Sequence, residues 1–229
     1  MIQLAAFDMA GTTIDDHGHV YAALRECVIE AGASVAATDL QTWMGVDKVT
    51  AVTALLRLGG VVPKPGLVSA AFDRFRVILD ARYRADPPVA LPGVEAAIAE
   101  LRSRGIKVAL TTGFSADVSG PLLESLGWTV GPGAGDTVDA VVTASDVPAG
   151  RPAPYLIHHA MEKTGVLDVR RVLAAGDTVV DLQAAVNAGA IAVGVLTGQL
   201  ERDGLLAHTH DYILESVVET LGLAETQPV

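Results

Sequence analysis

Short apolar runs alternate with longer amphipathic stretches along most of the chain. The apolar runs indicate buried strands at residues 2–7, 107–111, 140–143, 172–175 and 191–196. Helical periodicity lies between them, at residues 94–103, 121–126, 153–163 and 180–188. Strands that are apolar throughout and are separated by helices are typical of a parallel sheet covered on both faces. We therefore expect an α/β fold with a Rossmann-like parallel sheet.

One segment interrupts this alternation. From about residue 16 to residue 86 no strand is indicated, and helical periodicity recurs at 20–31, 48–58 and 67–83. The turn-rich sequences AGTTIDDHGH and PPVALPG bracket the segment. This pattern favours an all-helical domain of residues 16–87, inserted after the first strand of a core domain of residues 1–15 and 88–229. The alternative is a single continuous fold.

Composition and charge narrow the function classes. A chain with 50% apolar residues is too hydrophobic to be disordered, and a net charge of −11 disfavours nucleic acid and anionic membranes as partners. The single cysteine, Cys27, suits a reducing compartment. The opening MIQLAAFD lacks the basic region of a secretory signal, and no run is apolar over the ~18 residues that a membrane helix needs. We expect a cytoplasmic protein.

Chemically useful side chains follow several of the expected strands. Asp8 and Gly11 follow the first strand, and Thr112-Gly113 follows the second. Arg151 precedes Pro152, a residue favoured in the first turn of a helix. Taken singly, each of these residues has a structural reading as a turn residue or a surface cation.

Asp177 and Asp181 follow the strand at 172–175. They are spaced to supply oxygen ligands to a hard divalent cation, or to cap a helix. Because the carboxyl ends of parallel strands meet at one edge of a sheet, we expect the carboxylates, the hydroxyl and the cation of these motifs to form one site there.

These motifs, in this order, resemble motifs I to IV of the haloacid dehalogenase superfamily of hydrolases, with the helical insertion as its cap domain. Most phosphatases of that superfamily carry D-x-D-G-T and a motif III lysine, whereas this chain has D-M-A-G-T from Asp8 and G-R-P-A-P around Arg151. It also has Met44-Gly45-Val46-Asp47-Lys48, which matches M-G-x-x-K. All three features are similar to the phosphonoacetaldehyde hydrolase (phosphonatase)-like clade.

The resemblance implies the roles of individual residues. Asp8 would be the nucleophile, Lys48 the Schiff-base amine, and Thr112 and Arg151 further catalytic groups. The phosphoryl group and the rest of the substrate would be bound by residues of the motifs and the cap: Ala10, Gly11, Thr12, Met44, Gly45, Thr112, Gly113 and Arg151. Mg²⁺ would be held by Asp8, the backbone carbonyl of Ala10 and Asp177, with Asp181 behind these ligands. A small phosphonate or phosphate substrate and a homodimer joined through the cap are implied as partners.

The departures from the phosphatase pattern fit together chemically. Ala10 stands where phosphatases carry the acid that protonates a leaving alkoxide, so a phosphate ester is a poor fit. Cleavage of a C–P bond instead needs an electron sink, which a Schiff base provides. Lys48 is expected at the start of a helix with Asp47 as its N-cap, and partial desolvation together with the helix dipole would lower the pKa of its ammonium.

Three positions differ from authentic phosphonatases and leave the carbonyl substrate and the Schiff base open. Ala51, Phe114 and Gly18 stand where those enzymes usually carry histidine, tyrosine and cysteine. His17 and His19 are candidate proton-transfer groups in the loop around Gly18. Two alternatives remain: a phosphatase of this superfamily acting on a small phosphorylated metabolite, similar to phosphoglycolate phosphatase, and a catalytically silent phospho-ligand-binding protein.

Overall fold

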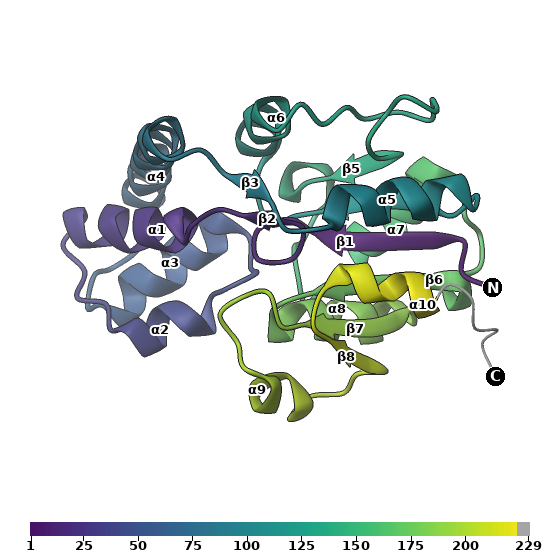
Figure 1. Ribbon diagram of the computed structural model, residues 1–229. Coiled ribbons are helices and arrows are strands. Elements are labelled where there is room, and N and C mark those ends of the chain that lie inside the picture. Colours follow the sequence, from purple (N-terminus) through teal and green to yellow (C-terminus); the bar gives the residue numbers. More distant parts are fainter. Residues whose placement is uncertain (224–229) are drawn as a thin grey trace.

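The structure is a computed structural model, which describes residues 1–223 of the chain. Its centre is a six-stranded sheet in which every strand is parallel to its neighbours, in the order β5-β4-β1-β6-β7-β8 (Figure 1). The strands are β1 (Leu4–Asp8), β4 (Lys107–Thr111), β5 (Ala140–Val142), β6 (Val172–Gly176), β7 (Ile191–Val195) and β8 (Tyr212–Leu214). The expectation of a Rossmann-like α/β fold is confirmed.

Helices cover both faces of this sheet. On one face α5 (Val94–Ser103) packs on β4 beside α10 (Thr220–Leu223), and on the other α7 (Tyr155–Thr164) and α8 (Val179–Ala188) pack together (Figure 1). An apolar core lies on each face of the sheet, and successive residues of β1 point to opposite faces. Ala5 and Phe7 pack into one apolar cluster, and Leu4 and Ala6 pack into the other. The other helices outside residues 16–88 are α6 (Ala116–Ser125), α9 (Arg202–Leu206) and the 3₁₀ turns η1 (Ala144–Asp146), η2 (Val169–Arg171) and η3 (Val217–Glu219).

A helical region is inserted after β1. Its helices are α1 (His19–Glu30), α2 (Ala37–Thr42), α3 (Lys48–Leu58) and α4 (Pro65–Ala85). The antiparallel pair β2 (Ile14–Asp15) and β3 (Val89–Ala90) brings the two connecting segments together. Figure 1 shows the four helices gathered beyond one end of the sheet. The all-helical insertion is therefore confirmed.

The differences from the sequence expectations have physical reasons. The sequence predicts neither β8 nor α2, because the apolar run of β8 is only three residues long and α2 buries no residue and so has no apolar face. The helix expected at 121–126 begins five residues earlier, at Ala116, and retains Pro121 inside it. The helix expected from residue 153 begins at Tyr155. Among residues 1–223 no helix is long and apolar enough to cross a membrane.

Candidate active site

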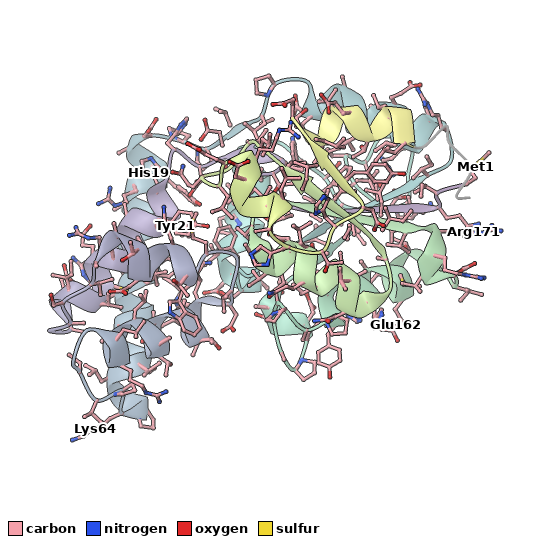
Figure 2. All side chains as sticks on the ribbon, turned by 90° about the horizontal axis from the view of Figure 1, so that it is seen from below. Met1, His19, Tyr21, Lys64, Glu162 and Arg171 are labelled. Carbon is pink, nitrogen blue, oxygen red and sulfur yellow. The ribbon has the colours of Figure 1, made fainter. Side chains whose placement is uncertain are left out.

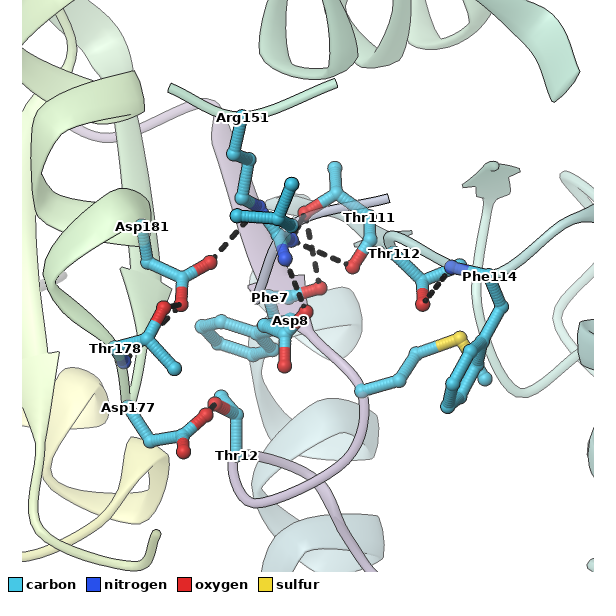
Figure 3. Close-up of polar contacts among 12 residues, drawn as sticks. Phe7, Asp8, Thr12, Thr111, Thr112, Phe114, Arg151, Asp177, Thr178 and Asp181 are labelled. Carbon is cyan, nitrogen blue, oxygen red and sulfur yellow. Dashed lines mark hydrogen bonds and ion pairs between the residues drawn. The ribbon is translucent and has the colours of Figure 1, made fainter. Parts of the chain in front are cut away.

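The carboxyl ends of three central strands bring the sequence motifs together. Asp8, the last residue of β1, is in register with Thr111, the last residue of β4, and β6 runs along the other side of β1 to end at Gly176. Gly11 turns the chain after Asp8 with a φ of +87°, a conformation that side chains disfavour. The Thr13 hydroxyl donates a hydrogen bond to the Asp8 carbonyl at 2.9 Å and fixes this turn. Motifs I, II and IV thus lie side by side (Figure 3).

Arg151 reaches into the site from the loop before α7 and links two of its carboxylates. Its Nη1 donates to Asp8 Oδ1 at 2.6 Å, and its Nε lies 2.8 Å from Asp181 Oδ1. Its Nη2 donates to both the carbonyl and the hydroxyl oxygen of Thr111 at 2.9 Å (Figure 3). Burial by itself lowers the pKa of the Arg151 guanidinium, but Asp181 and Asp8 outweigh it and raise that pKa. The guanidinium is therefore held as a fixed cation beside Asp8.

Asp177 and Asp181 occupy different environments at the end of β6. Asp181 caps α8, because its Oδ2 accepts hydrogen bonds from the backbone N–H of Thr178 at 3.1 Å and from the Thr178 hydroxyl. Within residues 1–223, Asp177 accepts a hydrogen bond only at Oδ1, from the Thr12 hydroxyl at 3.0 Å. Burial, together with the carboxylates of Asp8 and Asp181, raises the pKa of Asp177 well above its ordinary value. A cation at this point would relieve that repulsion.

The donor set beside Asp177 fits a hard divalent cation. Oδ2 of Asp8 and Oδ2 of Asp177 receive no hydrogen bond from residues 1–223, and neither does the Ala10 carbonyl. All three are oxygen donors, the type that Mg²⁺ prefers. Within the same residues, no group of three or more His, Cys, Asp or Glu side chains is arranged to hold a metal ion. Two carboxylates and a carbonyl need no third acidic ligand, and Asp181 is engaged with Thr178 and Arg151.

Lys48 is buried at the first position of α3, with 6% of its surface exposed. Asp47 is the N-cap of this helix, as the sequence predicts, and its Oδ1 accepts a hydrogen bond from the Thr50 N–H at 2.9 Å. The Lys48 Nζ donates to the Val46 carbonyl at 3.0 Å and lies 5.6 Å from the centre of the Phe114 ring. The amine thus has one neutral acceptor and an aromatic neighbour.

The surroundings of Lys48 favour the free amine. The pKa of the Lys48 ammonium is lowered to about 8: burial lowers it most, the attraction of Asp8 opposes this shift, and the positive charge of Arg151 adds to it. Asp47 opposes this shift as well. A neutral amine is a nucleophile toward carbonyl carbon, whereas an ammonium is not. The lowered pKa therefore increases the share of neutral, nucleophilic Lys48 near neutral pH.

Close backbone contacts seat the loop before α3 on the core. A Cβ on Gly45 would collide with the Thr178 hydroxyl and would lie 2.7 Å from a methyl of Val180, and one on Gly113 would lie 2.9 Å from the Val46 carbonyl. Met44 is buried. The Thr112 hydroxyl, buried as well, accepts a hydrogen bond from the Phe114 N–H at 3.1 Å. Residues of the helical region and of motifs II and IV thus meet at one place.

The sequence reasoning missed several residues of this site. Thr111 holds Arg151, and the Thr197 hydroxyl donates to the Gly11 carbonyl at 2.6 Å. Gly198 lies so close to Asp177 that no side chain fits there. A signal for the last two exists in the sequence, because Thr197-Gly198 follows the strand at 191–196 as Thr112-Gly113 follows its own strand.

His17 and His19 lie at the junction between α1 and the core rather than beside the carboxylates of the site. His19 Nε2 is 3.1 Å from Asp86 Oδ2, and His17 Nε2 is 3.8 Å from Asp86 Oδ1. Figure 2 shows His19 at the margin of the helical region and Lys64 at its outer tip. The buried position of Ala51 in α3 belongs to the packing of that helix.

Comparisons with known proteins agree with this geometry. The family model of haloacid dehalogenase-like hydrolases matches residues 2–189. Phosphonoacetaldehyde hydrolase from Bacillus thuringiensis (strain Al Hakam) is 33% identical over 216 residues, covering 87% of this chain and 78% of the relative. A hydrolase from Pseudomonas syringae matches with a TM-score of 0.85 at 22% identity, covering 100% of both chains. A phosphonoacetaldehyde hydrolase-like protein from Oleispira antarctica matches with a TM-score of 0.80 at 22% identity, covering 97% of this chain and 91% of the other. The two structural likenesses concern the fold alone.

Proposed function

Since this chain belongs to the haloacid dehalogenase-like hydrolase family, we propose that it cleaves the C–P bond of phosphonoacetaldehyde or a related 2-oxoalkylphosphonate. The observation that carries the proposal is the buried Lys48 amine, whose pKa is lowered to about 8 within the field of Asp8 and Arg151. The phosphonoacetaldehyde hydrolase relatives support it. Ala10, which has no acid to offer a leaving alkoxide, supports it as well.

The reaction begins at Lys48. The neutral amine attacks the carbonyl carbon, and loss of water leaves a protonated Schiff base. An Asp8 carboxylate oxygen then attacks phosphorus, the C–P bond breaks, and its electron pair moves toward the iminium nitrogen to give an enamine. The products of this step are an acyl phosphate on Asp8 and an enamine on Lys48.

Two hydrolyses complete the turnover. Water cleaves the acyl phosphate and releases inorganic phosphate, which restores Asp8. Protonation of the enamine carbon regenerates an iminium, and a second water releases acetaldehyde and the Lys48 amine. One water was lost in the first condensation, so the net reaction consumes one water for each phosphonate cleaved.

The other residues of the site position charge. Arg151 presents fixed donors to the phosphoryl oxygens, and Thr112 and the Gly113 N–H complete their binding. Asp8, Asp177 and the Ala10 carbonyl would hold Mg²⁺, which supplies positive charge opposite the developing charge on phosphorus. Asp181 orients Arg151 from behind. Residues 16–87 act as a cap domain over a core domain of residues 1–15 and 88–229, and exclude water from the carbanion-like step.

We propose a cytoplasmic enzyme with a small phosphonate as its substrate and Mg²⁺ as its cofactor. Dimerisation through the cap stays a prediction.

Phosphate release from phosphonoacetaldehyde with Mg²⁺ tests the proposal, together with trapping by borohydride. We expect borohydride and substrate to leave a covalent adduct on Lys48 of the wild type. Lys48→Arg, which keeps the charge but cannot form the Schiff base, should lose both the adduct and C–P cleavage. Full C–P cleavage by this variant would contradict the proposal. Brisk hydrolysis of small phosphate esters without any adduct would identify a phosphatase instead, and binding without turnover would identify a phospho-ligand-binding protein.

A further inference from the structure

A cavity of about 580 Å³ lies between the start of α3 and the loop that precedes α7. Lys48 and Arg151, both buried, belong to its wall. The cavity therefore adjoins the two residues that carry the amine and the guanidinium of the proposed reaction. Pockets of ~300–1,000 Å³ typically hold ligands of drug size, which are far larger than a two-carbon aldehyde. The proposed reaction on phosphonoacetaldehyde leaves most of this space unexplained.

Beyond Lys48 and Arg151, the wall of the cavity combines apolar side chains with the hydroxyl groups of Thr50, Ser115 and Ser145. Apolar side chains come from the helical region and from the loop after β5: Val49, Phe72, Ala144, Val147, Pro148 and Ala149. The remaining charged side chain in the wall is Asp47, which already accepts the Thr50 N–H. An anionic group in this space would face the Asp47 carboxylate and gain no new cation, whereas an alkyl group would exchange water for apolar contacts.

Geometry decides which part of a substrate enters the cavity. In a 2-oxoalkylphosphonate, the carbonyl carbon is bonded to the methylene that carries phosphorus and to one further substituent. The phosphoryl group is directed to Asp8 and Arg151, and the carbonyl carbon to the Lys48 amine. The substituent on the carbonyl carbon is then the part that is free to extend along the wall formed by Val49 and Phe72.

Building on the proposed function, we infer that the preferred substrates are 2-oxoalkylphosphonates whose carbonyl carbon carries an unbranched alkyl group of several carbons. The cavity next to Lys48 selects these ketones by burying the alkyl chain, and Asp47 selects against a carboxylate at the same position.

A series of ketones tests this inference. We would compare kcat/KM for phosphate release from 2-oxopropyl-, 2-oxobutyl-, 2-oxopentyl- and 2-oxoheptylphosphonate, with phosphonopyruvate as the anionic analogue and phosphonoacetaldehyde as the reference. Each buried methylene is expected to raise kcat/KM about fourfold until the cavity is filled. Phosphonopyruvate is expected to react more slowly than 2-oxopropylphosphonate, which has the same number of carbons, and than 2-oxobutyl- and 2-oxopentylphosphonate, whose alkyl groups bracket the carboxylate in size.

A matched pair of variants locates the effect. Val49→Phe narrows the cavity and should lower the ratio of kcat/KM for 2-oxopentyl- over 2-oxopropylphosphonate about tenfold. Val186→Phe makes the same change at a similarly exposed valine on α8, outside the cavity wall, and should leave that ratio unchanged. The ratio is measured within each variant, so a general loss of activity does not affect it.

The outcomes separate this inference from the proposed function. Cleavage of phosphonoacetaldehyde with a flat or falling ketone series would overturn the inference and leave C–P cleavage standing. A ratio that Val49→Phe and Val186→Phe change equally would also overturn it. Absence of phosphate release from every oxophosphonate, with turnover of phosphate esters, would overturn the proposed function and the inference with it.

Discussion

Arg151 Nη1 lies 2.6 Å from Asp8 Oδ1, so the proposed nucleophile is held by the cation that is proposed to bind the phosphoryl group. Both side chains are buried, and each neutralises the other. An incoming phosphoryl dianion must share Arg151 with Asp8. This sharing would loosen the hold of Arg151 on Asp8 Oδ1 and leave that oxygen to attack phosphorus, while Oδ2 stays available to the metal ion.

This pairing predicts a large effect of removing the guanidinium. Arg151→Gln leaves Asp8 and Asp181 buried without their cation and should lower the free energy of unfolding by about 3–5 kcal/mol, with loss of phosphate release. Urea unfolding measures the stability. Arg171→Gln, at an exposed arginine, is the control and should change stability by less than about 1 kcal/mol. Equal stability of the two variants would contradict the stabilising role of the ion pairs that Arg151 makes with Asp8 and Asp181.

The metal site predicts opposite effects of Asp177→Asn with and without Mg²⁺. Without the ion, the variant should melt at a higher temperature than the wild type, because one of several repelling buried carboxylates is removed. Mg²⁺ at about 100 times its Kd should stabilise the wild type by about 2.7 kcal/mol and the variant much less. Thermal unfolding with and without Mg²⁺ measures both effects. Asp168→Asn, at the N-cap of η2 away from the site, should respond to Mg²⁺ as the wild type does.

The sequence predicts the centre of the fold and the edge at which this site lies. β1, β4 and β6 are apolar throughout, and the carboxyl ends of parallel strands place Asp8, Thr112 and Asp177 at one edge of the sheet. The match to M-G-x-x-K singles out Lys48 among four lysines.

The sequence does not predict other parts of the site, because contacts between residues far apart in the chain leave no periodic pattern in it. Arg151 lies in a loop without regular secondary structure. Nothing in the sequence around it indicates that its guanidinium will contact Thr111 and Asp181. The contact between Gly45 and Thr178 joins residues 133 positions apart, one in the loop before α3 and the other at the N-cap of α8. The cavity beside Lys48 likewise forms only when α3 and the loop after β5 are brought together.

The buried lysine predicts a conflict between activity and stability. The folded-state pKa of Lys48 is lowered to about 8, so the unfolded chain holds the proton more tightly between pH 8 and about 10.4. The free energy of unfolding should therefore rise with pH across that window, and the full penalty should be present below pH 8. Lys48→Met should abolish C–P cleavage and raise stability at pH 7 by about 1–3 kcal/mol.

Urea unfolding of wild type and Lys48→Met at pH 7 and pH 10 checks this prediction. The difference between the two proteins should shrink at the higher pH. Lys64→Met, at an exposed lysine at the N-cap of α4, is the control and should leave the free energy of unfolding unchanged at both pH values. A destabilised Lys48→Met with normal folding would contradict the burial penalty.

The same pKa predicts the pH profile of the reaction. The amine must be neutral to attack the carbonyl, so kcat/KM for C–P cleavage should rise about tenfold per pH unit below pH 8 and level off above it. A lysine with an ordinary pKa of about 10.4 would give a profile that still rises at pH 9. Measurement from pH 6 to pH 10, with Mg²⁺ held constant, distinguishes the two.

An ion pair between α4 of the helical region and α6 of the core is expected to stabilise the packing of the helical region on the core. Arg76 on α4 pairs with Asp117 on α6, whereas Arg74 on α4 pairs with Glu30 on α1, inside the helical region. Arg76→Gln should raise KM about two- to fivefold, the range expected for an exposed pair, and make KM less sensitive to salt. Arg74→Gln should leave KM and its salt dependence unchanged. Steady-state kinetics at low and high NaCl measures the effect.

Gly45 has a consequence for how this chain can change over generations. A methyl group at position 45 collides with the hydroxyl of Thr178, and the positive φ of +75° adds a backbone penalty. A descendant that gains a side chain at position 45 must have a smaller residue at 178 or 180, or a displaced loop before Lys48. Positions 45, 178 and 180 are therefore expected to vary together among related sequences, even though they belong to different parts of the fold.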